Sequence, residues 1–146
     1  MCLILHQNKS KKNIQLDQNS NFAKRLNKAK KGEITCWKAY ERRSTSKKLV
    51  SMVMDAQIKE PGVIHSGRKN GLSNEEKEKG QVYRAIHVFT KRKEAENRIV
   101  YSYDVVVPVI CRKKDLVAQG NSEDAAFSKI RIEKRTWNKI FAKKNL

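Results

Sequence analysis

The sequence predicts a single α+β domain, with a mostly antiparallel central sheet of about five strands, one or two short helices and a basic N-terminal arm. Three observations support this prediction. The length of 146 residues fits one domain. Runs of β-branched and aromatic residues recur between polar stretches, which is typical of strands. Apolar residues with helical spacing occur only in short segments, so the helices are expected to be few.

Five segments carry the strand pattern: Glu33–Glu41, Leu49–Met54, Val82–Phe89, Asp104–Cys111 and Ser128–Glu133. The first follows Gly32, and the second is its expected hairpin partner. Asp104–Cys111 is the most apolar stretch and is predicted to be a buried strand. Pro108 within it indicates an edge strand or a bulge, because proline cannot donate to a ladder.

Two helices are expected after strands. Lys91–Arg98 follows the strand that ends at Phe89, and Trp137, Ile140 and Phe141 have helical spacing near the end of the chain. Glu60–Gly80 contains Pro61 and four glycines, which predicts a long irregular connection.

The chain divides at residue 31 into a basic N-terminal arm, 1–31, and one α+β domain, 32–146. Residues 10–31 are dominated by Asn, Gln and Lys, with Phe22 and Leu26 as isolated apolar points. Asn21–Lys31 has the composition of one short basic helix. We favour a solvated arm here over a docked recognition helix, because an isolated charge run usually faces water.

The charge balance is the strongest compositional feature. Lys and Arg total 33 against 15 Asp and Glu, a formal net charge of +18. Such an excess causes self-repulsion unless a ligand or counter-ions neutralise it. The expected partner is therefore nucleic acid, an acidic protein face, a phosphorylated small molecule or an anionic membrane surface, and charge alone does not choose among them.

The cysteines and the first residues of the chain bear on the cellular location and on the kinds of site to expect. Cys2, Cys36 and Cys111 show no CxxC spacing and few histidines accompany them, so neither a disulfide framework nor a metal site is indicated. Free thiols indicate a reducing compartment, and the cytoplasm is the expected location. The apolar run in Met1–His6 is too short for a signal sequence or a membrane span, so no membrane partner is expected. No cofactor is indicated.

Several short motifs occur in a recognisable order: Met1-Cys2-Leu3, Ile34-Thr35-Cys36-Trp37-Lys38, His87-Val88-Phe89 before Glu94-Ala95, the run Asp104–Ile110, Gly120 and Ala126–Ile132. This order resembles a small, largely uncharacterised family of phage and prophage proteins over most of 34–132. The resemblance implies a host-interaction or counter-defence protein. The strand layout is also distantly similar to ADP-ribosyltransferase folds, although fold analogy does not transfer an activity.

Residues with catalytic potential are few. Cys2 would become an N-terminal nucleophile if Met1 were removed, but we favour packing beside Leu3 and Leu5. His87 is interpreted as a packed or hydrogen-bonded histidine. Glu123 and Asp124 precede the last strand and are interpreted as solvent-facing loop groups. No catalytic residue is therefore assigned.

The basic residues form two candidate binding sets. In the first, cations surround the turn after the first strand and aromatic residues precede it: Arg42, Arg43, Lys47 and Lys48 with Trp37 and Tyr40. Cations can contact phosphates while aromatic faces stack on bases. The core cannot absorb these charges, so they are expected to face water or a partner, and replacing Arg42 and Arg43 is expected to leave stability unchanged. The second set comprises Arg68, Lys69 and Arg84, with Tyr83 beside them.

The favoured function is a non-enzymatic basic binding module of phage type, acting on nucleic acid or on an acidic host complex that handles nucleic acid. The alternative is a nucleotide-directed protein, either an ADP-ribosyltransferase-like enzyme or a pocket that sequesters a signalling nucleotide. Copurification separates the two, since a pocket retains an ultraviolet-absorbing small molecule, whereas a basic surface retains polymer that high salt removes.

Overall fold

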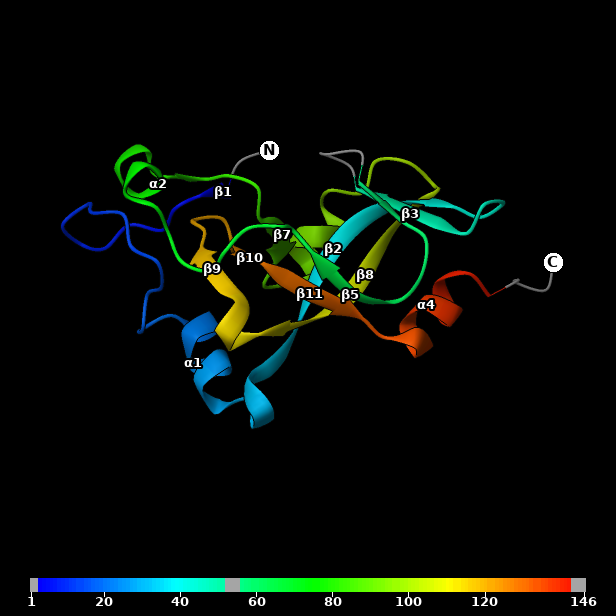
Figure 1. Ribbon diagram of the computed structural model, residues 1–146, viewed down its shortest axis with the longest axis horizontal. Helices are drawn as coiled ribbons and strands as arrows, with labels where there is room; N and C mark the ends of the chain where they lie inside the picture. Colours follow the sequence, from blue (N-terminus) through cyan, green and yellow to red (C-terminus); the bar gives the residue numbers. More distant parts are fainter. Residues whose placement is uncertain (1–2, 52–55, 143–146) are drawn as a thin grey trace.

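The computed structural model describes residues 3–51 and 56–142. Within these ranges eleven strands form a nine-stranded antiparallel sheet and a separate two-stranded sheet, with four short helices around them (Figure 1). The strands are β1 (Leu3–Ile4), β2 (Glu33–Arg43), β3 (Lys48–Ser51), β4 (Gln57–Ile58), β5 (Gly62–His65), β6 (Gln81–Val82), β7 (Ile86–Phe89), β8 (Asp104–Arg112), β9 (Leu116–Gln119), β10 (Asp124–Phe127) and β11 (Lys129–Ile132). The helices are α1 (Asn21–Lys28), α2 (Asn74–Lys79), α3 (Arg92–Glu96) and α4 (Lys134–Ile140), with 3-10 turns η1 (Lys30–Gly32) and η2 (Lys113–Asp115).

This architecture corrects the predicted fold class. The α+β prediction with about five strands is wrong, because the protein is mostly β and its main sheet has nine strands. Glu60–Gly80, expected to be irregular, contains both β5 and α2. The single strand expected at Val82–Phe89 is split into β6 and β7, because Arg84 has φ of 57°, a left-handed conformation that interrupts a strand. The strands that were not predicted, β1, β4, β5, β9 and β10, have only two to four residues, and such short strands seldom show enough alternation to be recognised in sequence.

The long antiparallel pair of β2 and β8 organises the main sheet. The order is β5-β11-β8-β2-β7-β10-β9, with β3 paired to one end of β2 and β4 paired to β3. β2 and β8 register from Glu33 opposite Arg112 to Glu41 opposite Asp104, which confirms the strands predicted there. β8 is an interior strand, so it is not the edge strand that Pro108 suggested. The missing N–H of Pro108 is tolerated because β11 registers with β8 at Ile110, beyond the proline.

The N-terminal segment is part of the folded body and is not an arm. β1 pairs with β6, and Leu3 and Leu5 are buried. α1 begins at Ser20, whose hydroxyl accepts the backbone N–H of Ala23, and it buries Phe22 and Leu26. The two apolar residues lie four positions apart on one helix face, which is why a lysine-rich segment can dock on the core.

The core has two parts because the main sheet is covered on one face and, at β9 and β10, also on the other. The main core takes alternate residues of β2, including Cys36 and Tyr40, together with α1 and with Trp137 of α4. The second core joins Leu3, Leu5 and Val82 to the opposite face of β9 and β10. We call the face of β2 and β8 toward the main core the inner face, and the other the outer face.

Four further segments have the predicted type of secondary structure, although Phe141, expected in the last helix, lies just after its end. α3 lies within the helix expected at Lys91–Arg98, α4 covers the spacing of Trp137 and Ile140, and β11 lies within Ser128–Glu133. β3 begins the expected hairpin partner at Leu49–Met54, of which residues 52–55 lie outside the described ranges. Among the described residues, no helix is long and apolar enough to cross a membrane.

Candidate anion-binding site

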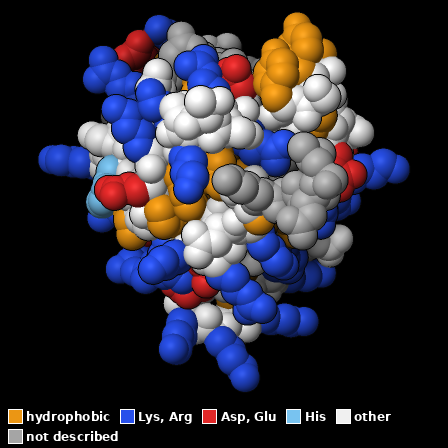
Figure 2. Space-filling model, turned by 90° about the vertical axis from the view of Figure 1, so that its right-hand side faces the viewer, with side chains coloured by type: hydrophobic (Ala, Val, Ile, Leu, Met, Phe, Trp, Pro, Cys, Tyr) orange, Lys and Arg blue, Asp and Glu red, His pale blue; other side chains and the backbone are white. Residues whose placement is uncertain are grey.

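The first predicted basic set lies at the end of the β2–β3 hairpin. Arg42 and Arg43 are the last residues of β2, Lys47 is in the turn and Lys48 begins β3. Arg43 is exposed, with a guanidinium nitrogen 3.5 Å from a carboxylate oxygen of Glu41. Figure 2, which views the right-hand side of Figure 1, shows lysine and arginine side chains over much of that face and few acidic ones.

Arg42 does not present its charge to a ligand as expected. It is half-buried, its Nη1 donates to the backbone carbonyl of Ile140 at 3.2 Å, and its Nε is buried without a hydrogen-bond partner in the described residues. Ile140 is the last residue of α4, so the guanidinium closes the helix C-terminus, where unpaired carbonyls attract cations. The expectation that Arg42 faces water or a partner is corrected accordingly.

The two aromatic residues of this set lie on opposite faces of β2. Tyr40 is 1% exposed within the main core, and burial raises the pKa of its hydroxyl. It cannot stack on a base, which corrects the role predicted for it. Trp37 is half-buried on the outer face, and the guanidinium carbon of Arg25 lies 5.9 Å from its ring centroid.

The second predicted set is brought together around one hollow of about 580 Å³, which Arg68, Lys69, Tyr83 and Arg84 all line. Arg68, however, holds Glu76 with two bonds of 2.7 and 2.9 Å and donates to three backbone carbonyls. The Arg68 guanidinium lowers the pKa of Glu76 to about 2. Arg68 therefore fixes α2 to the loop before it, and among the described residues that line this hollow Lys69 and Arg84 are the exposed cations.

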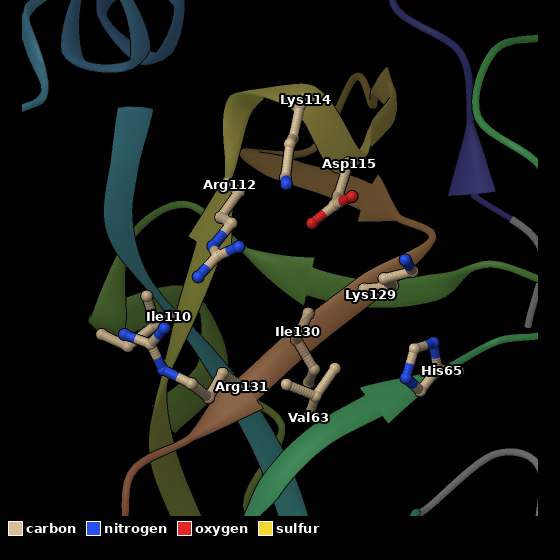
Figure 3. A pocket seen from close by; sticks show the side chains of 9 residues that line it. All are labelled: Val63, His65, Ile110, Arg112, Lys114, Asp115, Lys129, Ile130 and Arg131. Atoms are coloured by element: carbon tan, nitrogen blue, oxygen red, sulfur yellow. The ribbon is translucent and has the colours of Figure 1, made fainter. Parts of the chain in front are cut away.

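A third group of cations, absent from both predicted sets, surrounds a cavity of about 260 Å³ at the junction of β5, β11, β8 and η2 (Figure 3). Val63, Ile110 and Ile130 supply its apolar lining, and its polar lining is Arg112, Lys114, Lys129, Arg131, His65 and Asp115. In Figure 3 the side chains of Arg112, Lys114 and Asp115 point toward the cavity from one side. Five basic side chains from four elements thus meet around one opening.

A larger hollow of about 600 Å³ adjoins this cavity and shares Arg112 and Lys114 with it. Lys31, Lys113 and Glu33 also line it. We call the two together the basic trough, with cations Lys31, Arg112, Lys113, Lys114, Lys129 and Arg131, and with His65. Six Lys and Arg side chains against the carboxylates of Glu33 and Asp115 leave the trough strongly positive, which favours anions.

Glu33 orients two of the trough arginines. Its Oε2 accepts from Nε of Arg112 at 2.9 Å and from Nη1 of Arg131 at 3.1 Å. These bonds, first from Arg112 and then from Arg131, lower the pKa of Glu33. One carboxylate shared by two guanidinium groups leaves both with free donors, and such forks match phosphate oxygens.

Strand register places Trp37 on the same face as the trough. Glu33 opposes Arg112, Thr35 opposes Ile110 and Trp37 opposes Pro108, and alternate residues of a strand share a face. Four residues along β2 separate Glu33 from Trp37, about 13 Å of strand. The predicted aromatic residue and the unpredicted cations therefore belong to one outer surface.

The sequence did not predict the trough because its residues are far apart along the chain. The pairing of β5, β11 and β8 brings most of them together. Two local signals existed. Lys129 and Arg131 alternate on a strand, so they share a face, and Arg112-Lys113-Lys114 directly follows the most apolar strand.

Two further interpretations are resolved by the structure. His87 is hydrogen-bonded as predicted, with Nε2 2.7 Å from Oδ2 of Asp124. Asp124 is not a solvent-facing loop group, since it is 6% exposed and also accepts the backbone N–H of Ser122. Cys2 lies outside the described residues.

Comparisons of this chain with models of known protein families, with curated proteins and with solved structures found no match.

Proposed function

We propose that this protein binds nucleic acid, with backbone phosphates held in the basic trough. The supporting observation is the convergence of Arg112, Lys114, Lys129 and Arg131 around a single cavity. Phosphate contacts by Lys and Arg supply most of the sequence-independent affinity for nucleic acid. The formal net charge of +18 adds long-range attraction to the same class of ligand.

The size of the cavity favours a polymer over an enclosed small molecule. About 260 Å³ is below the roughly 300–1,000 Å³ typical of pockets that bury a whole small ligand. The volume suits a phosphate group with part of its sugar, while the rest of the chain continues into the adjoining hollow. Arg43, Lys47, Lys48, Lys69 and Arg84, the predicted cations that remain exposed or half-exposed, would add peripheral contacts.

A salt titration with a labelled oligonucleotide tests this proposal. Lys114→Ala with Lys129→Ala removes two exposed trough cations whose side chains make no hydrogen bond within residues 3–51 and 56–142, so the fold should persist. We expect weaker binding and a salt slope reduced by about 0.7 for each lost phosphate contact. The matched control is Lys9→Ala with Lys77→Ala, which removes the same charge from exposed positions outside the trough.

Equal weakening by the trough and control variants would contradict the proposal, because the charge would then act only as a diffuse field. A salt-independent affinity would exclude polyanion binding altogether.

A nucleotide-directed function is the second candidate, because the adjoining hollow of about 600 Å³ lies within the size range of small-molecule pockets. Competition distinguishes the two. If free nucleotide displaces the oligonucleotide completely at comparable concentration, the site is a nucleotide pocket. If only polymer competes, the site recognises a backbone.

The partner proposed in the cell is nucleic acid itself, and the alternative is an acidic host complex that handles nucleic acid, as the phage-like motifs suggest. A pull-down from a bacterial lysate with and without nuclease separates them. Nuclease removes a nucleic-acid partner and leaves a direct protein partner in place.

A further inference from the structure

Two exposed tyrosines form a parallel pair at the other end of the β2–β8 ladder. Tyr101 and Tyr103 are 56% and 43% exposed, their ring centroids are 5.1 Å apart and their planes differ by 7°. Val100 beside them is 72% exposed. Exposed aromatic residues usually stand singly, whereas these two rings stack on one another and remain open to solvent, so the stack can be extended by a further aromatic ring. We call this surface the tyrosine pair.

The backbone under the tyrosine pair is firmly held. Oδ2 of the buried Asp104 accepts the N–H groups of Val100 at 3.2 Å and Tyr101 at 3.0 Å. The N–H of Asp104 donates to the carbonyl of Tyr101, and the N–H of Arg42 donates to the carbonyl of Tyr103, both at 3.0 Å. The segment is therefore ordered before any ligand arrives, which lowers the entropic cost of binding.

The surroundings of the tyrosine pair favour a nucleic-acid base over an apolar protein face. The bond from Arg42 to Tyr103 ties the pair to the β2–β3 hairpin, which carries the cations Arg43, Lys47 and Lys48. The core of a protein interface is depleted of charge. An aromatic surface beside lysines and arginines instead suits a base on the ring and its phosphate on a cation.

The strandedness of the ligand follows from the geometry of stacking. In a duplex both faces of each base are covered by neighbouring base pairs, so a protein ring can stack only on an unpaired base. β8 runs from Asp104 beside the tyrosines to Arg112 in the trough, about 26 Å of extended strand. One flexible single strand could contact both ends of this ladder.

We infer that the ligand is single-stranded nucleic acid and that Tyr101 and Tyr103 are its base-stacking platform. This inference rests on the proposed function, because it assigns bases to the same polymer whose phosphates the trough holds.

The experiment compares single-stranded and duplex oligonucleotides of one sequence, longer than the roughly 4–16 nucleotides that small single-strand-binding domains occupy. Tyr101→Ala with Tyr103→Ala should weaken single-strand binding roughly 5- to 150-fold, the effect of losing one base–aromatic stack, and leave duplex binding unchanged. Tyr101→Phe with Tyr103→Phe keeps the rings and should bind normally. Circular dichroism verifies the fold of each variant.

The outcomes separate this inference from the proposed function. If the trough variant weakens binding and the alanine variant does not, the inference falls and the proposed function stands. If neither variant weakens binding, both fall. Equal losses for single strand and duplex would exclude base stacking. Full binding by Tyr101→Leu with Tyr103→Leu would exclude base stacking, and a change of oligomeric state in the alanine variant would show that the surface contacts a second copy of this chain.

Discussion

Arg42 and Arg43 are neighbours at the end of β2, yet strand alternation gives their side chains different surroundings. Arg42 reaches the C-terminus of α4, and Arg43 points into solvent beside Glu41. Lys38, on the inner face of β2, is another basic residue whose surroundings are set by strand alternation. Its ammonium donates to the carbonyl of His87 at 2.7 Å, and its Nζ lies 5.5 Å from the centroid of the Tyr40 ring. These contacts hold the charged end of Lys38 away from water.

The first prediction at the residue scale concerns the arginine pair. Arg42→Ala removes the cation that closes α4 and should lower the free energy of unfolding by about 1–3 kcal/mol. Arg43→Ala removes only a surface pair and should change it by less than about 0.5 kcal/mol. Urea unfolding of both variants measures the difference. Equal free energies of unfolding for the two variants would show that Arg42 does not stabilise the end of α4.

The second concerns Lys38 and pH. Burial lowers the pKa of Lys38 from 10.5 to about 8. Between these pH values the unfolded chain holds a proton on Lys38 that the folded chain has released. The free energy of unfolding therefore rises with pH in this window. The stability gained in this way is lost again as pH falls to about 8. Lys38→Met should remove that contribution. Unfolding of wild type and variant at several pH values within the window measures it, and parallel profiles would contradict it.

At the scale of elements, short segments acquire structure from their neighbours. β5 is four residues long and alternates poorly, but it pairs along its whole length with β11. α1 has eight residues, below the length at which a helix is stable alone, so its stability comes from packing. The basic trough is built the same way, since β5, β8, β11 and η2 each contribute only two or three of its lining residues.

The prediction at this scale tests whether α1 belongs to the core. Leu26 is 1% exposed, and Leu26→Ala should lower the free energy of unfolding by about 2–5 kcal/mol through lost burial and a cavity. The control is Lys24→Ala, on the exposed face of the same helix, which should change it by less than about 0.5 kcal/mol. Thermal or urea unfolding measures both. A small effect of Leu26→Ala would restore the picture of a detached basic arm.

At the scale of the whole molecule, the β2–β8 ladder sets the spacing of the two proposed contact regions. The basic trough lies where β2 begins and β8 ends, and the tyrosine pair lies where β8 begins. A ladder of nine paired positions is stiff, so the two regions keep their separation without a ligand. The main core covers the inner face of β2 and β8, and the second core covers the opposite side only at β9 and β10, so charged residues lie at the rims and on the outer face of β2 and β8.

Features that depend on composition or on a local residue pattern could be predicted from the amino-acid sequence alone. The net charge, the strands β2, β8 and β11, the helices α3 and α4 and the hydrogen-bonded His87 follow from composition, β-branched runs and helical spacing. The exposed charges at Arg43 and Lys47 follow from the cost of burying an unpaired cation.

The number of strands, the docking of α1 and the contacts of each cation depend on how distant segments pack together. Strand pairing joins residues far apart in the chain, so the meeting of His65 with Lys114 and Lys129 leaves no local trace. Burial also depends on which face a neighbouring element covers. Tyr40 therefore entered the core while Trp37, three residues earlier, stayed on the outer surface, and Arg42 met α4 nearly a hundred residues later in the chain.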